Sequence, residues 1–114
     1  MKIENYSFGE MNVNGVVYKN DLIIYPDRIE TDWWREQGHS LSINDLESIL
    51  QYKPDYLIIG RGAYKNMNIP AKTLDFLKEN RIEIISGDTQ KMSNIFNQFL
   101  EENKKAVGAF HLTC

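Results

Sequence analysis

The chain has little cysteine and no long apolar run, and each shortage excludes a class of protein. Its single cysteine, Cys114, is the last of 114 residues, so no disulfide bond can form within the chain. This agrees with a reducing compartment. Neither a Cys-x-x-Cys pair nor a His-x-x-x-His spacing occurs, and we therefore predict no structural metal site.

Basic residues are also scarce. The chain has 13 Lys and Arg against 16 Asp and Glu, which gives a formal net charge of -3. A nucleic-acid binder usually needs a basic stripe, so we expect no nucleic-acid partner. No segment approaches the roughly 18 apolar residues of a membrane span. The segment from Met1 to Tyr6 lacks the apolar core of a signal peptide, and we expect a soluble cytoplasmic protein without a membrane partner.

What the chain does contain is enough apolar material for one packed core. Hydrophobic residues make up 42% of the sequence and aromatic residues 11%, with no linker, repeat or low-complexity segment between them. This length and composition predict a single domain that spans residues 1–114.

The first third of the sequence predicts strands. Asn14-Gly15 is a tight-turn dipeptide, because both residues tolerate positive φ, and it separates apolar segments at 11–13 and 16–18. A strand at 22–25 ends at Pro26, and residues 28–33 can form one more. Hairpins of this kind contribute antiparallel pairs to a sheet.

The remainder alternates helix and strand. Ser42 and Asp45 form a capping-box pattern before a first helix, and Pro70 suits the first turn of a second. The third helix has the clearest apolar period, carried by Met92, Ile95, Phe96, Phe99 and Leu100. Strands are expected at 56–59, 82–86 and 106–112, the last of them central. Together with the hairpins, this alternation predicts an α/β fold with a mixed sheet.

Several short motifs together resemble one known family. They are Trp33-Trp34-Arg35 with Gly38-His39, Pro54-Asp55 with Ile58-Ile59-Gly60-Arg61-Gly62, Thr89 with Asn97, and His111-Leu112-Thr113-Cys114. In order and spacing they resemble the adipogenesis-associated Mth-type domain family, which includes a mitochondrial respiratory complex I assembly factor. The resemblance implies a three-layer α/β domain with a mixed central sheet, and it brings no catalytic mechanism. Without a mitochondrial N-terminal extension, the chain resembles a stand-alone prokaryotic member.

Two glycine-containing turns are candidates for a small anionic ligand. Gly60, Arg61 and Gly62 follow a buried strand, and Gly87 and Thr89 end the next one, so both turns should lie at the carboxyl edge of the sheet, where ligands usually bind. Arg61 would supply a cation, while Thr89 and backbone amides would supply donors. The alternative is structural: a turn that needs positive φ, and ordinary helix capping by Asp88 or Thr89.

A dinucleotide is not expected at this loop. The Rossmann fingerprint would require a third glycine at position 65, where the sequence has Lys65. We therefore predict no cofactor.

Trp33, Trp34 and Arg35 are the candidates for a protein partner. Neighbouring residues on a strand point to opposite faces, so one tryptophan should enter the core and the other should reach the surface. An exposed tryptophan beside an arginine can anchor a partner, since both residue types are enriched at binding hot spots. The alternative is that both tryptophans cover the edge of the core.

His39, His111 and Cys114 do not form a recognisable catalytic set. A Cys–His pair needs its side chains within hydrogen-bond reach, and nothing in the sequence holds Cys114 near His39. We expect His39 to stabilise a turn and His111 to be a hydrogen-bonded strand residue. No catalytic residue is identified.

The leading hypothesis is a non-enzymatic protein-interaction or assembly-type domain. The alternative is a binding protein for a small anionic ligand, or an enzyme, with its site at the Gly60–Gly62 and Gly87–Thr89 loops. A homodimer is compatible with a small domain that carries an N-terminal β-layer, although no motif points to one directly.

Overall fold

The computed structural model describes all residues from 1 to 114. It contains eight strands and three α-helices, with a short 3₁₀ turn at Ile43–Leu46 before the first helix. The elements are β1 (Ile3–Ser7), β2 (Glu10–Val13), β3 (Val16–Tyr18), β4 (Leu22–Ile24), β5 (Ile29–Glu30), α1 (Glu47–Tyr52), β6 (Tyr56–Arg61), α2 (Ala71–Glu79), β7 (Glu83–Gly87), α3 (Thr89–Glu101) and β8 (Ala106–His111). None of the helices is both long and apolar enough to cross a membrane.

The central sheet is mixed, as the sequence predicts. Its five strands run in the order β5-β4-β8-β6-β7. Strands β8, β6 and β7 are parallel, whereas β4 pairs antiparallel with both β8 and β5. The last strand of the chain is therefore central, as expected, and all six of its residues are buried. The first three strands form a separate antiparallel sheet in the order β1-β2-β3.

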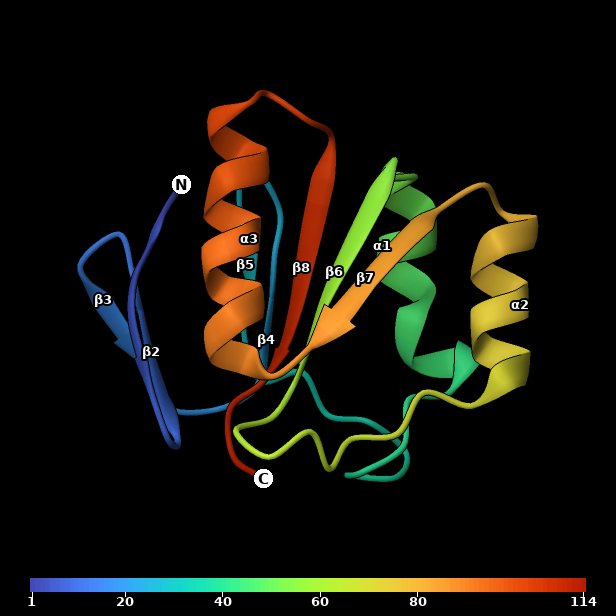
Figure 1. Cartoon of the computed structure of the whole chain (residues 1–114), viewed down its shortest axis with the longest axis horizontal. Helices are drawn as coiled ribbons and strands as arrows, with labels where there is room; N and C mark the ends of the chain where they lie inside the picture. Colours follow the sequence, from blue (N-terminus) through green and yellow to red (C-terminus); the bar gives the residue numbers. More distant parts are fainter.

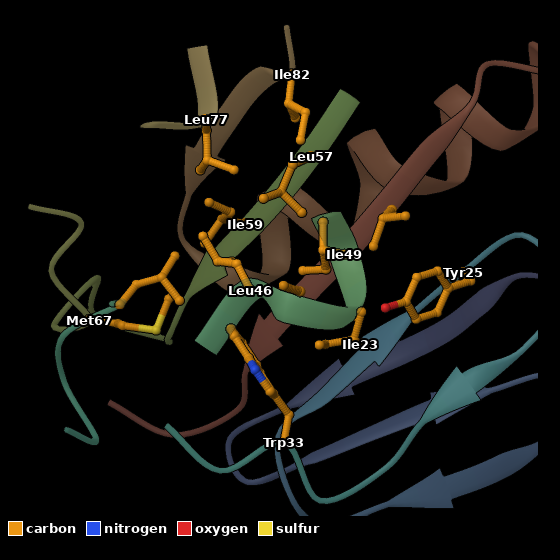
Figure 2. Close-up of a cluster of buried hydrophobic side chains, with 13 residues drawn as sticks. Ile23, Tyr25, Trp33, Leu46, Ile49, Leu57, Ile59, Met67, Leu77 and Ile82 are labelled. Atoms are coloured by element: carbon orange, nitrogen blue, oxygen red, sulfur yellow. The ribbon is translucent and has the colours of Figure 1, made fainter. Parts of the chain in front are cut away.

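Three layers result, and Figure 1 shows them side by side. Helix α3 and the β1–β3 sheet cover one face of the central sheet, while α1 and α2 cover the other. Each interface has its own hydrophobic cluster. Phe96 of α3 packs against Phe110 of β8 on the first face, with ring centroids 5.8 Å apart. Trp33 and Leu46 pack near Ile59 of β6 on the second, as Figure 2 shows.

Local sequence signals account for several boundaries. Asn14 and Gly15 have φ of 54° and 88°, and they form the predicted tight turn between β2 and β3. The side chain of Asp88 accepts a hydrogen bond from the Lys91 amide at 2.9 Å, which caps α3 as one of the two expected caps. The backbone amide of Ser42 donates to the Asp45 carboxylate at 2.8 Å, so the predicted capping contact begins the 3₁₀ turn.

The strand predicted at 28–33 is shorter in the structure and ends before the tryptophans. Only Ile29 and Glu30 pair with β4. Asp32 adopts a φ of 55°, a left-handed conformation that cannot continue an extended strand. Trp33 and Trp34 consequently lie on a loop, and not on a strand as expected.

The carboxyl edge of the parallel strands is the lower edge in Figure 1, and the C-terminus lies there. The last residues of the chain are bound to the loop after β6: the Ala63 amide donates to the Thr113 carbonyl at 2.7 Å, and the Asn66 amide to the Cys114 carbonyl at 2.9 Å. Gly62 has a φ of 100°, and a Cβ at this position would overlap the Cys114 backbone. The loop and the C-terminal residues therefore fit together only around a glycine.

Replacing Gly62 with alanine should destabilise the fold by about 2 kcal/mol or more, because the change combines an unfavourable φ with a backbone clash. Gly38→Ala is the matched control, since a Cβ at Gly38 meets nothing within 4 Å. Urea unfolding of the two variants measures the difference. Equal stabilities would show that the close approach at Gly62 does not constrain the edge.

Candidate functional site

A buried cluster of Asp21, Arg35 and His111 lies at the carboxyl edge. One carboxylate oxygen of Asp21, Oδ2, lies 2.7 Å from Arg35 Nη2 and 2.7 Å from His111 Nδ1. The other, Oδ1, accepts a hydrogen bond from the Leu112 amide at 2.8 Å. The side chains of Asp21, Arg35 and His111 are 13%, 4% and 6% exposed, so three ionisable groups are held almost out of water.

The sheet register brings these residues together. Leu22 of β4 lies opposite Phe110 of β8 in an antiparallel pair, which places Asp21, just before β4, beside His111 at the end of β8. Arg35 enters from the loop after β5 and is fixed by the Gly38 carbonyl, which accepts from both Nε and Nη2, at 3.1 Å and 2.8 Å.

The hydrogen bonds decide the charge of Asp21. Burial alone would raise the pKa of this carboxyl, but hydrogen bonds from His111, the Leu112 amide and Arg35 outweigh it and lower the pKa below its ordinary value. Asp21 is therefore ionised at neutral pH. Nδ1 of His111 lies 2.7 Å from this ionised acceptor and 3.1 Å from Arg35 Nη2. The two protons of Nη2 are donated to Asp21 and to the Gly38 carbonyl, so the carboxylate contact favours a proton on Nδ1. The ring nitrogen Nε2 is then left for other partners, and the nearest is Thr113 Oγ1 at 3.5 Å.

A pocket of about 250 Å³ opens beside this cluster. Its walls come from the residues before β4, the loop after β5 and the end of β8, and they are Lys19, Asn20, Asp21, Trp34, Arg35, Gly38, His39, His111, Leu112 and Thr113. The exposed His39 ring meets the His111 ring edge-on, with centroids 5.5 Å apart. No three His, Cys, Asp or Glu side chains gather in a way that would hold a metal ion.

The two predicted ligand loops do meet in space, but their donors are used within the chain. The Thr89 hydroxyl is buried; it accepts from the Gly62 amide at 2.9 Å and donates to the His111 carbonyl at 2.6 Å. Arg61 donates from Nε to the Met67 carbonyl at 2.7 Å and so holds its own loop.

The glycines of these loops allow close packing. A Cβ on Gly60 would lie 2.7 Å from the Phe110 ring, and one on Gly87 would lie 3.0 Å from the Met92 side chain. The anionic site at Gly60, Arg61, Gly62, Gly87 and Thr89 stays a prediction.

The predicted partner residues divide into buried and exposed ones. Trp33 is 5% exposed and its Nε1 donates to the Asp45 carbonyl at 3.1 Å, whereas Trp34 is 73% exposed. The two tryptophans therefore point to opposite sides, even though they lie on a loop. Arg35 does not stand beside Trp34 on the surface as expected: it is buried, and its guanidinium carbon lies 4.8 Å from the Trp33 ring centroid.

A second hollow, a groove of about 620 Å³, adjoins Trp34. It runs between the loop after β5 and the start of α1, and its lining residues include five acidic ones: Glu30, Asp32, Glu36, Asp45 and Glu47. The only basic residue in the lining is Arg35, which is already paired with Asp21.

Sequence reasoning named Arg35 as a partner residue, expected His39 at a turn and His111 as a hydrogen-bonded strand residue, and missed Asp21. The sequence holds only a weak signal for Asp21. Its carboxylate directly precedes β4, whose residues are all buried, so a neighbouring antiparallel strand would enclose it. Its contact with His111 spans 90 positions of sequence.

Asp21→Asn should lower the free energy of unfolding at neutral pH by about 3 kcal/mol, because it breaks a buried ion pair. The pKa of Asp21 is lowered in the folded protein, so its contribution is full above about pH 4 and is lost as pH falls through the folded value. The difference in free energy of unfolding between wild type and variant should therefore become smaller as the pH is lowered. Urea unfolding from about pH 7 to about pH 2 measures it.

Asp27→Asn is the control for this experiment, since the Asp27 side chain is 72% exposed and should change stability little at any pH. If the difference in free energy of unfolding between wild type and Asp21→Asn were the same at every pH tested, an ionised Asp21 would be contradicted.

Solved structures with the same fold come from archaea and bacteria. A conserved hypothetical protein from Pyrococcus horikoshii is 27% identical, with a TM-score of 0.81 and coverage of 100% of both chains. An outer membrane protein from Bartonella henselae is 20% identical, with a TM-score of 0.83 and coverage of 98% of this chain and 94% of that one. A Bordetella pertussis protein described as an Mth938-like domain is 16% identical, with a TM-score of 0.72 and coverage of 97% and 85%. The last two establish likeness of fold alone.

A family model gives the membership directly. It matches residues 3–111, nearly the whole chain, and its description is "Protein of unknown function (DUF498/DUF598)". The chain belongs to this family of small α/β domains, whose description assigns no activity.

Proposed function

We propose that the protein is a cytoplasmic protein-interaction domain of the assembly-factor type, and that it binds a basic segment of a partner protein along the groove beside Trp34. The observation that carries this proposal is a tryptophan left 73% exposed at the rim of a groove with an acidic lining. A large apolar side chain is costly to leave in water, and exposed apolar surface rimmed by polar groups is typical of interaction sites.

The charge of the groove favours a basic partner. Glu36 and Glu47 are exposed, and their carboxylates make no hydrogen bond within the chain, so both are free to pair with a partner. Other acids of the lining hold the groove in shape: Asp45 accepts from the Glu36 amide at 3.0 Å, and Glu30 accepts from the Ser48 hydroxyl at 2.7 Å. A lysine or arginine entering the groove would therefore meet carboxylates that are partly fixed in place.

Trp34 adds an anchor of a different kind. The face of an indole ring attracts an ammonium or guanidinium group, and its area excludes water from nearby ion pairs. The other two predicted partner residues hold the loop that carries Trp34. Trp33 packs in the core, and Arg35 fixes the loop through Asp21 and Gly38. The loop thus presents Trp34 from a held position, which lowers the entropy cost of binding.

The resemblance to a family with a respiratory-complex assembly factor supports the same class of function, because such a factor acts by binding other proteins. A small anionic ligand, with or without catalysis, is the second candidate. It is favoured by the pocket beside Asp21 and His111, which lies at the carboxyl edge but not at the two loops first considered.

Trp34→Ala should weaken binding of a fluorescein-labelled lysine- and arginine-rich peptide by about tenfold or more, as loss of a hot-spot residue does. Fluorescence anisotropy at low and moderate salt measures the affinity, and the same peptide with glutamate at every basic position tests the charge preference. Glu36→Lys combined with Glu47→Lys should have an effect of similar size and should flatten the salt dependence.

Tyr64→Ala is the matched control, because Tyr64 is 70% exposed but lies outside the groove. Equal binding of the basic and acidic peptides, or an equal loss on Tyr64→Ala, would refute the groove as the binding surface.

A further inference from the structure

The pocket beside Asp21 and His111 has a chemistry opposite to that of the acidic groove. Apart from Asp21 its lining holds no acidic residue, and Lys19, His39, His111 and Thr113 each carry a side-chain donor. The Trp34 indole is a further donor, and Nη1 of Arg35 is buried without a hydrogen-bond partner. Lys19, His39 and Thr113 are exposed, and His111 presents a small edge. Several donors therefore surround one small space.

The charges of this lining sum to a positive value. Asp21 and Arg35 form an ion pair and cancel each other, and both Asp21 oxygens are already occupied by donors of the chain. What remains is the Lys19 ammonium together with two imidazoles. The protein as a whole has a net charge of -3, so a positive pocket differs in sign from the molecule that carries it. Such a pocket would attract small anions and raise their local concentration.

His111 is held in a form that suits an anion. Because Nδ1 faces the Asp21 carboxylate at 2.7 Å, Nε2 is the ring nitrogen left for a ligand. A proton on Nε2 makes a cation that donates to Asp21 on one side and to the ligand on the other, as in other histidine–carboxylate pairs. The charged or titratable groups around His111 are Asp21, Arg35, His39 and Arg61, whose guanidinium is turned to the Met67 carbonyl.

We propose that this pocket binds a small oxyanion, a phosphate-type or carboxylate group, through Lys19, His39 and Nε2 of protonated His111. Its volume of about 250 Å³ is below the roughly 300–1,000 Å³ of sites for drug-sized ligands, which suits a single small acid or one anionic group of a larger compound. Binding favours the protonated imidazole, so affinity rises as pH falls. This proposal rests on the second candidate function given above, and its site is separate from the peptide groove, although Trp34 borders both.

Nitrogen-15 NMR of the two histidine rings tests this proposal directly. Sulfate stands in for a phosphate group and acetate for a carboxylate. Neither changes its charge between about pH 6 and about pH 8, so a difference in affinity between these pH values reports on the protein. Each is titrated at constant ionic strength against chloride. We expect saturable movement of the His39 and His111 signals, with affinity about tenfold higher at the lower pH. The tighter of the two anions identifies the ligand class.

The variants leave Asp21 and His111 intact, so the fold is not at risk. Lys19→Ala combined with His39→Ala should abolish saturation, and Lys78→Ala, at a lysine of α2 that does not line the pocket, should leave it unchanged. No saturable movement with either anion in the wild type, an equal loss on Lys78→Ala, or equal affinity at both pH values would overturn the proposal.

Discussion

Asp21 is the residue on which the carboxyl edge depends. Its carboxylate holds three segments that are distant in sequence: the start of β4, the end of β8 at His111 and Leu112, and the loop after β5 through Arg35. Removing an ionised carboxylate from water is costly, and here three donors compensate it within hydrogen-bond distance. The cost is tolerated because the same contacts fix the loop that carries both tryptophans. The buried ion pair is thus a positioning device, and its net gain in stability is secondary.

The fixed loop places the two adjacent tryptophans in different environments. The Arg35 guanidinium lies over the ring of Trp33, which packs in the hydrophobic cluster with Leu46 and Ile49, whereas Trp34 is exposed. Trp34 remains between an acidic groove and a positive pocket. The two hollows beside Trp34 therefore carry opposite charge. Two ligands of opposite charge would fit them, whereas one ligand in a single shared site would not need both.

The fold was largely predictable from the sequence, whereas the site was predictable only in part. Apolar period and turn chemistry place α3, the Asn14-Gly15 turn and the central β8, because those signals are local. Strand β5 is shorter than predicted because Asp32 takes a left-handed conformation, which an aspartate tolerates without any visible signal. Arg35 and His111 could be named from motifs, but their meeting depends on the register of β4 against β8. Asp21 was missed for the same reason: a carboxylate at a turn looks solvated until a partner strand encloses it.

The topology also explains why the pocket lies at β4 and β8, away from the glycine loops. The connections that follow β6 and β7 cross to opposite faces of the sheet, an arrangement that usually opens a crevice between adjacent strands. Here Thr89, the loop after Gly62 and residues 113–114 fill that crevice with hydrogen bonds of their own. At β4 the strand direction reverses, so the beginning of one strand lies beside the end of another. Because of that reversal, Asp21 lies at an edge that is otherwise built from the ends of strands. There it meets His111, and the parallel strands alone do not provide this pair.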